Sequence, residues 1–290
     1  MKKQQGFTLI ELMIASLISI FLITGIMNLF ITTNKTVSLS DALSQNQETG
    51  RFAMDYLTRF LRNAGYTQNA TLSPPELMIK NSNPDFEFLC SVGSADYDAC
   101  AVNNPDSDTI RGDRLSIVYV ASATEIGRTS CTGSDVGGAI GEQKLADVFW
   151  VSNEAGSQRE LRCRTYDIDN NNWLAGTVSI INNVESFEYQ VGLASSDTSK
   201  NVSRYTSMDN IDEALNKRIR SIRVAILTTS INDLDVDHVK TSIRTRKYGV
   251  LDADQEVGTD KPLEFNDGNL RSLFITTIEL PSSIESAMHN

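Results

Sequence analysis

A run of 23 residues without a charged side chain, from Leu12 to Asn34, constrains the fold of this 290-residue chain more than any other feature. An α-helix rises about 1.5 Å per residue and the hydrocarbon core of a bilayer is about 30 Å thick, so about 20 apolar residues cross it. Gly25 is the one helix-weakening residue in the run, and the first proline of the chain is Pro74. The sequence therefore predicts a membrane-spanning helix near the N-terminus.

The residues before this run indicate its orientation and its processing. Lys2 and Lys3 precede it, and basic residues tend to stay on the cytoplasmic side, so we expect everything after about Asn34 to be exported. A secretory signal is cleaved after its apolar region, whereas here the only plausible junction, Gly6–Phe7, comes before it. Cleavage at that junction would leave the membrane helix on the mature protein.

Glu11 places one carboxylate at the start of this otherwise apolar helix. A charge within a membrane helix costs about 2.5–3.5 kcal/mol on insertion scales and by default indicates a function with a partner group. The alternative is a charge tolerated near the interface, because Glu11 lies only about one helical turn beyond the Gly6–Phe7 junction.

The stretch from Gly6 to Leu12, Gly-Phe-Thr-Leu-Ile-Glu-Leu, resembles the N-terminus of type IV prepilins. The resemblance implies that a prepilin peptidase cuts after Gly6 and that the new amino group of Phe7 is methylated. It also implies that Glu11 pairs with the N-terminal amine of a neighbouring subunit. Such a pair would relieve both charges of the cost of lying alone in lipid, and it would select the axial register between subunits.

Apolar residues continue at helical spacing beyond the membrane segment, which predicts an amphipathic continuation of the helix over residues 35–65. The stripe consists of Leu39, Leu43, Ala53, Leu57, Phe60, Leu61 and Ala64. Polar Asn46 and Gly50 interrupt it, and Gly65 is placed for a left-handed cap at its end. A coiled-coil stalk is the alternative, but the repeat lasts too few heptads, so we expect this half of the helix to pack on a sheet.

Residues 66–290 are expected to form an exported β-rich domain. Residues 66–113 are rich in Asn, Ser, Asp and Pro, which predicts a surface loop region with one short strand near 76–79. A short helix is predicted over 209–217, and loops over 124–142 and 195–207. Strand-like runs, several of them alternating apolar and polar residues, cover 114–121, 147–151, 160–166, 184–193, 219–229 and 270–280.

These predictions together describe an α+β fold of the pilin type, with one long N-terminal helix packed on an antiparallel β-sheet. Residues 1–6 would be the leader, 7–34 the membrane and polymerisation helix, 35–65 its amphipathic continuation and 66–290 the globular domain.

Four cysteines follow the membrane helix, and an even number in an oxidising compartment favours disulfides. They are Cys90, Cys100, Cys131 and Cys163. Four cysteines allow three pairings, of which we favour Cys90–Cys100, across a polar loop, together with Cys131–Cys163. No spacing of cysteines and histidines suggests zinc, and the two histidines lie far apart, so neither a metal nor another cofactor is expected.

The charge pattern and the remaining short motifs argue against several other functions. The formal net charge is −11 at pH 7, and the basic stretches 217–223 and 244–247 are dispersed, so direct binding to nucleic acid is not expected. Asp167–Asn171 and Asp233–Asp237 resemble the start of a calcium loop but lack its glycine and its final glutamate, which favours simple turns. Arg111-Gly-Asp113 is interpreted as the turn into the next strand rather than a receptor motif. No hydrolase, metalloprotease or phosphate-loop motif occurs, so an enzyme is not expected.

Three further stretches, Gly50–Tyr66, Arg218–Thr229 and Leu270–Leu280, resemble the minor pilins of the PilW type. The resemblance implies a subunit of the initiating complex near the pilus tip, with other minor and major pilins and a tip adhesin as partners. The chain would lie in the inner membrane as a prepilin and then in a pilus that serves adhesion, twitching motility or DNA uptake. Asn28 departs from the family, since many major pilins have a helix-kinking proline there.

Two alternatives remain open at the level of sequence. The first is a J-type pseudopilin of type II secretion, which the stretch Gly50–Tyr66 also approaches. The second is an uncleaved, membrane-anchored binding module.

Overall fold

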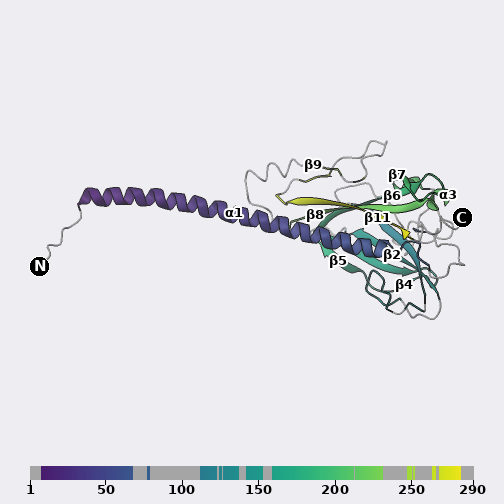
Figure 1. Cartoon of the computed structure of the whole chain (residues 1–290). Helices are drawn as coiled ribbons and strands as arrows, with labels where there is room; N and C mark the ends of the chain where they lie inside the picture. Colours follow the sequence, from purple (N-terminus) through teal and green to yellow (C-terminus); the bar gives the residue numbers. More distant parts are fainter. Residues whose placement is uncertain are drawn as a thin grey trace.

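The computed structural model describes residues 8–67, 77–78, 112–122, 124–125, 127–136, 142–152, 159–211, 213–230, 247–249, 251, 263–265 and 268–281. One helix, α1 (Leu9–Leu61), dominates the first part of the chain, and its 53 residues correspond to about 80 Å. Figure 1 shows its first half projecting from the rest of the chain and its second half lying against strands. The prediction of one long N-terminal helix that packs on antiparallel strands is therefore confirmed.

The end of α1 is tied to the first strand, β1 (Leu115–Ala121). The α-helix stops at Leu61, four residues before the end of the predicted range 35–65, and Arg62 is its C-cap. Gly65 follows in the predicted left-handed conformation, with a φ of 72°. Its N–H donates to the carbonyl oxygen of Val118 (2.7 Å), and Tyr66 accepts from the N–H of Val120 (2.8 Å). The glycine thus turns the chain out of the helix and onto the edge of β1.

Two antiparallel sheets follow, where the sequence predicted one. The first contains β1, β2 (Gln143–Val151), β3 (Glu160–Asp167) and β4 (Asn172–Trp173) in that order, with β5 (Val178–Asn182) paired with β3. The second has the order β11 (Arg271–Glu279), β8 (Ile219–Thr229), β6 (Val184–Ala194) and β7 (Val202–Thr206). Two-residue strands β9 (Lys247–Tyr248) and β10 (Leu263–Glu264) pair separately.

Short helical segments connect β7 to β8. They are the 3₁₀ turn η3 (Met208–Asn210) and the helix α3 (Glu213–Asn216). In place of one predicted helix over 209–217, the described residues form η3 and the four-residue α3. The predicted loop over 195–207 is wrong for β7, which occupies Val202–Thr206.

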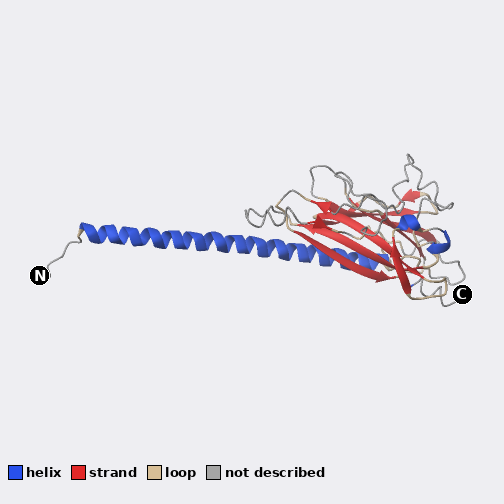
Figure 2. Cartoon of the chain, turned by 90° about the horizontal axis from the view of Figure 1, so that it is seen from above, coloured by secondary structure: helices blue, strands red, loops and turns tan. Residues whose placement is uncertain are grey.

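The second half of α1 and both sheets share one hydrophobic core. Ala53, Leu57 and Leu61 of α1 are completely buried in a cluster that includes residues of β1, β3, β6 and β8. α1 contacts β11, β8 and β5 directly, and Figure 2 shows the strands gathered around its C-terminal half. This packing fixes where the projecting half of the helix points relative to the globular part.

Candidate functional site

The N-terminus of α1 carries the one predicted site residue of the membrane segment that the structure describes, Glu11; Gly6 and Phe7 lie outside the described residues. Glu11 is held by Thr8 in a capping box. One carboxylate oxygen of Glu11 accepts both the N–H and the hydroxyl of Thr8, each at 2.9 Å, while the Glu11 N–H donates to the Thr8 hydroxyl at 3.4 Å. The first turn of the helix thus orients the carboxylate.

This arrangement has its own sequence signature, beside the prepilin motif. A Thr followed three residues later by Glu, before an apolar run, is the capping-box pattern, and here it satisfies two helix-end donors that have no backbone partner. The hydrogen bonds between Thr8 and Glu11 lie at an exposed position, so the Glu11 carboxylate remains accessible to a group from another chain.

The projecting half of α1 has no packing partner within the described residues. Its large apolar side chains from Leu9 to Ile31 are between 47% and 80% exposed. Hydroxyls along this segment donate to carbonyl oxygens of their own helix, as at Ser19 to Ala15 (2.8 Å) and Thr24 to Ile20 (2.7 Å), which satisfies them without water. By length and composition α1 is the one helix of the described chain that could cross a membrane.

The junction between α1 and the second sheet uses the two residues that interrupt the apolar stripe. Asn46 is 1% exposed, and its side-chain amide donates to the carbonyl oxygen of Leu270 at 2.9 Å. A Cβ atom placed on Gly50 would lie 2.2 Å from the ring of Phe274, so the missing side chain permits the close approach of β11. In contrast Leu43, which belongs to the predicted stripe, is 40% exposed.

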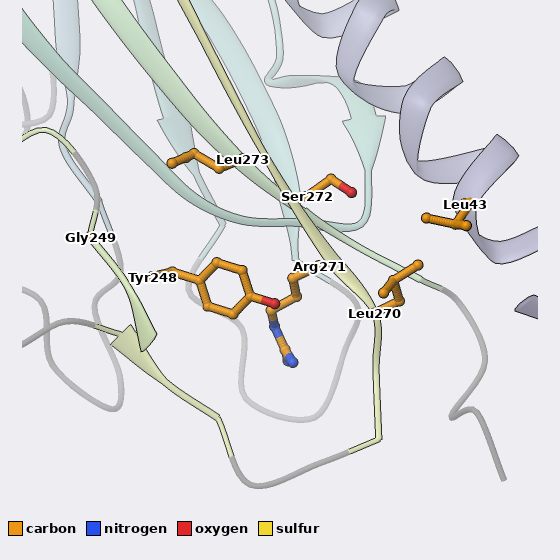
Figure 3. A pocket seen from close by; sticks show the side chains of 7 residues that line it. All are labelled: Leu43, Tyr248, Gly249, Leu270, Arg271, Ser272 and Leu273. Atoms are coloured by element: carbon orange, nitrogen blue, oxygen red, sulfur yellow. The ribbon is translucent and has the colours of Figure 1, made fainter. Parts of the chain in front are cut away.

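A pocket of about 450 Å³ opens beside this junction, where α1 enters the globular part (Figure 3). Its walls are Leu43, Tyr248, Gly249, Leu270, Arg271, Ser272 and Leu273. The guanidinium of Arg271 is engaged by Glu185 at 3.0 Å and lies 3.5 Å from the centre of the Phe265 ring. The pocket therefore offers apolar walls and the Ser272 hydroxyl, and its single cation is already committed to the fold.

The cysteines divide into two pairs with different outcomes. Cys90 and Cys100 lie outside the described residues, so that pairing stays a prediction. Cys131 and Cys163 are both buried and both free thiols in the structure, so the favoured bond between them is not formed there. The two side chains nevertheless belong to one buried core cluster, and the Cys131 sulfur lies 3.6 Å from the hydroxyl oxygen of Thr165, two residues after Cys163.

The carboxylates of the first calcium-like segment are satisfied by the chain itself. Asp167 accepts from the backbone and side-chain amides of Asn170 (3.0 and 2.8 Å), and Asp169 accepts from the N–H of Lys144 (2.7 Å). Asn171 completes the turn with a φ of 54°. Among the described residues no group of acidic, histidine or cysteine side chains could hold a metal ion. The second segment, Asp233–Asp237, lies outside the described residues.

In the Arg111-Gly-Asp113 tripeptide, Gly112 and Asp113 lead into β1 as expected, and Arg111 lies outside the described residues. The aspartate has a structural partner. Asp113 is 1% exposed, and its carboxylate accepts from the N–H of Tyr189 at 3.1 Å. Gly112 has a φ of 97°, and a Cβ there would lie 2.4 Å from the carbonyl oxygen of Phe187. Residues 112 and 113 therefore pair with β6, and the Asp113 carboxylate is not presented to a receptor.

Comparison with known proteins places the two ends of the chain in described families. Residues 1–27 match the prokaryotic N-terminal methylation motif. Residues 148–282 match the family model of type IV pilus-assembly protein W. The chain is a minor pilin of the PilW type.

The two matches of this PilW-type pilin cover distinct structural parts. The methylation motif covers the leader and most of the projecting half of α1, including Glu11. The PilW match begins within β2 and ends just after β11, so it contains the whole second sheet. Residues 28–147 lie in neither match.

A type IV-like pilin from Thermus thermophilus matches with a TM-score of 0.39 and 14% sequence identity, over 84% of this chain and 96% of that chain. No curated protein matches the chain.

The PilW-type assignment gives the coarse function and location. The chain is a membrane-anchored, single-pass pilin that is processed at its methylation motif and assembled with other pilins into a surface pilus. Its role is that of a pilus-assembly protein.

Proposed function

We propose that this chain is a subunit of the initiating complex at the tip of a type IV pilus, and that it acts there by packing rather than by catalysis. The observation that carries the proposal is the architecture of α1. One half is packed into the globular core, whereas the other exposes apolar side chains along its length and carries one oriented carboxylate. A helix of this kind needs a membrane before assembly and the helices of other pilins after it.

The processing steps follow from the sequence. The prepilin, with its N-terminus in the cytoplasm and residues 66–290 in the periplasm, is held in the inner membrane by residues 7–34. A prepilin peptidase removes residues 1–6 and Phe7 receives the methyl group. Residues 35–65 then connect the globular domain to the N-terminal half of α1, which enters the filament. We call α1 the rod.

Glu11 supplies the assembly contact in this proposal. One of its carboxylate oxygens accepts both Thr8 donors, which leaves capacity on the carboxylate for the ammonium of a neighbouring Phe7. In a low-dielectric environment a subunit set in the wrong register would leave two unpaired charges, so the pair selects the register.

The partners in this proposal are the prepilin peptidase, other minor pilins, the major pilin and a tip adhesin. The pilus would serve adhesion, twitching motility or DNA uptake. Binding to nucleic acid by this subunit is not part of the proposal, because the chain has a formal net charge of −11.

Two measurements on the native system test the proposal. The intact mass of the protein extracted from membranes should correspond to residues 7–290 with one added methyl group; retention of Met1–Gly6 on an unmethylated terminus would instead indicate an anchored binding module. Deletion of the gene should abolish or strongly reduce surface pili. Normal pili together with loss of exported enzymes would assign the chain to type II secretion as a J-type pseudopilin.

A further inference from the structure

A small loop closes over the inner face of the first sheet and carries Cys131 at its tip. Thr129 and Asp135 form an isolated antiparallel bridge at its base, and the N–H of Ser130 donates to Ser134 across it (2.9 Å). Cys131 is 1% exposed and Ser130 beside it is buried, whereas Thr132–Asp135 are half-buried or exposed. The loop thus acts as a plug whose tip enters the core; we call residues 127–136 the plug loop.

The tip of the plug loop lies against the face of β3 that carries Cys163. The Cys131 sulfur is 3.6 Å from the hydroxyl oxygen of Thr165, and Thr165 is two residues from Cys163 on the same face of that strand. Cys163 is completely buried and belongs to the same core cluster as Cys131. Since side chains two residues apart on one face of a strand are neighbours, the position of the Cys131 sulfur beside Thr165 brings it close to Cys163.

Three elements hold the tip in this place. The Cys131 N–H donates to Asp147 of β2 at 3.2 Å, and the other oxygen of Asp147 accepts the Thr165 hydroxyl at 2.7 Å. From α1, the hydroxyl of Tyr56 donates to the carbonyl oxygen of Cys131. The plug loop is therefore a contact between the rod and the first sheet.

We propose that Cys131 and Cys163 are joined by a disulfide in the exported protein, and that this bond holds the plug loop under Tyr56 of α1. The proposal needs residues 35–290 to be exported, but it does not need the chain to enter a pilus. It closes a segment of 33 residues, and cross-links of this kind act mainly by restricting the unfolded chain.

The bond forms by exchange with an external disulfide, either a low-molecular-weight disulfide or an exported protein that carries one. The thiolate of one cysteine attacks this disulfide, forms a mixed disulfide and releases one thiolate. The second cysteine then attacks the sulfur of the first, forms the Cys131–Cys163 bond and releases the other thiolate. The two protons of the cysteines end on the released thiols, and the external disulfide takes up the two electrons.

The order of events follows from burial. Desolvation raises the pKa of the Cys131 thiol well above its ordinary value, so little thiolate exists once the plug loop has closed. Thiolate is the reactive form, and the oxidation therefore belongs to folding after export, before the tip is buried. The finished bond should then be slow to reduce in the native protein and fast to reduce after unfolding.

The test uses the full chain extracted from membranes in detergent, unfolded in the presence of an alkylating reagent and without reductant, and then digested. The peptides that contain Cys131 and Cys163 should appear linked, lighter by two hydrogens than their sum, and should take up alkyl groups only after reduction. Four cysteines are present, so the linked peptides themselves must be identified. Alkylation of either cysteine without reductant, or a link from either to Cys90 or Cys100, overturns the proposal.

Matched variants separate this bond from the other two cysteines. In a Cys90→Ala, Cys100→Ala background, reductant should still lower the unfolding midpoint by about 5–10 °C. In that background Cys131→Ala, Cys163→Ala and the double variant should share one midpoint and lose the response to reductant. Additive losses in the two single variants, or a midpoint that reductant does not move in the background protein, would show that the two thiols act separately and would overturn the proposal.

Discussion

At the scale of single residues, Gly50 marks the closest approach between the rod and the second sheet. A Cβ there would lie 2.2 Å from a ring carbon of Phe274, a separation that side chains do not tolerate. We expect Gly50→Val to displace this ring and lower the free energy of unfolding by about 2 kcal/mol, since overpacking costs about 1–3 kcal/mol. Urea denaturation of the detergent-solubilised protein measures the change.

Two comparisons isolate the cause of this loss. Gly25 has no atom within 4 Å of its added Cβ, so Gly25→Val introduces the same side chain into open space and should leave stability nearly unchanged. In a Phe274→Ala background Gly50→Val should cost little, because the ring that it displaces is absent. An equal cost in both backgrounds would show that the penalty arises within the helix and not at the contact with β11.

Asp147 should give the folded protein a pH-dependent stability. The carboxyl is fully buried, and desolvation raises its pKa from an ordinary 3.8 to about 6. Between these values the folded chain keeps a proton that the unfolded chain has released, so the contribution of Asp147 to the free energy of unfolding falls as pH rises. The fall should amount to about 3 kcal/mol, since one pKa unit corresponds to about 1.36 kcal/mol.

The measurement compares the wild type with Asp147→Asn, which cannot titrate, at pH 4, 5, 6 and 7. The stability of the wild type relative to the variant should decrease across this range and level off above about pH 7. Carboxylates with a lowered pKa, such as Glu125, contribute with the opposite sign, but they are common to both proteins and cancel in the difference. Parallel curves for the two proteins would contradict the assignment.

Single residues also show what the sequence could and could not reveal. Glu11 was recognisable because a charge in an apolar run is anomalous by itself. The Thr8–Glu11 capping box was readable from its spacing, yet the prepilin resemblance drew attention to the charge alone. Asn46 and Gly50 resemble interruptions of an apolar stripe in the sequence. Their roles depend on contacts with the Leu270 carbonyl and the Phe274 ring, which lie more than 200 residues away in the chain.

At the scale of elements, a buried arginine fixes the hairpin between β6 and β7. Arg220 is 1% exposed, and its guanidinium donates to the carbonyl oxygens of Ser199 (2.9 Å), Lys217 (2.7 Å), Ile219 (3.1 Å) and Asp197 (2.5 Å). Arg220→Met keeps the aliphatic stem but removes these donors. We expect a loss of about 2–3 kcal/mol and faster amide exchange in residues 195–201, because buried acceptors are left without partners.

The control for this prediction is a neighbouring arginine. Arg218 pairs with Asp197 at 2.6 Å, but their side chains are 34% and 54% exposed. Arg218→Met should therefore cost less than about 1 kcal/mol. Similar losses in the two variants would mean that the general positive charge of this end, rather than the buried clamp, stabilises the hairpin.

The strands that were predicted from sequence share a physical property. β8 occupies the predicted residues 219–229, and β1, β3 and β6 agree within about one residue, because each turns an apolar face to the common core. β11 also agrees within about one residue, although only Arg271 and Ile278 among its nine residues are buried. β2 begins at Gln143, four residues before the predicted start at 147. β5 and β7 were missed. Their residues are mostly exposed or half-buried, and each is recruited by one neighbour, β3 or β6. The division into two sheets was also missed, because the alternation of apolar and polar residues along a strand does not indicate which strand pairs with it.

At the scale of the whole molecule, the two halves of α1 differ in their surroundings. The C-terminal half packs in the core of the globular part, and the N-terminal half leaves its apolar side chains exposed. Buried side chains of α1 begin at Ala42, Leu39 just before it is half-buried, and the apolar residues from Leu9 to Val37 are exposed. The globular part can therefore fold around residues 42–61 independently of whatever surrounds residues 9–31. Changes at Glu11 should alter assembly without altering the stability of the sheets.

The last prediction separates the two roles that Glu11 combines. Glu11→Gln keeps an oxygen that can accept the Thr8 donors of the capping box, since glutamine serves that position as well, but it removes the charge. Thr8→Val removes the capping hydroxyl and keeps the carboxylate. If the charge pairs with a neighbouring amine, Glu11→Gln should reduce the amount of this subunit in sheared pili by at least tenfold, whereas Thr8→Val should reduce it by a few-fold at most. Both variants should still be processed at Gly6–Phe7, as measured by the intact mass of the protein extracted from membranes. The opposite ranking would mean that the carboxylate serves the helix end of its own chain, and that register is selected by the apolar side chains instead.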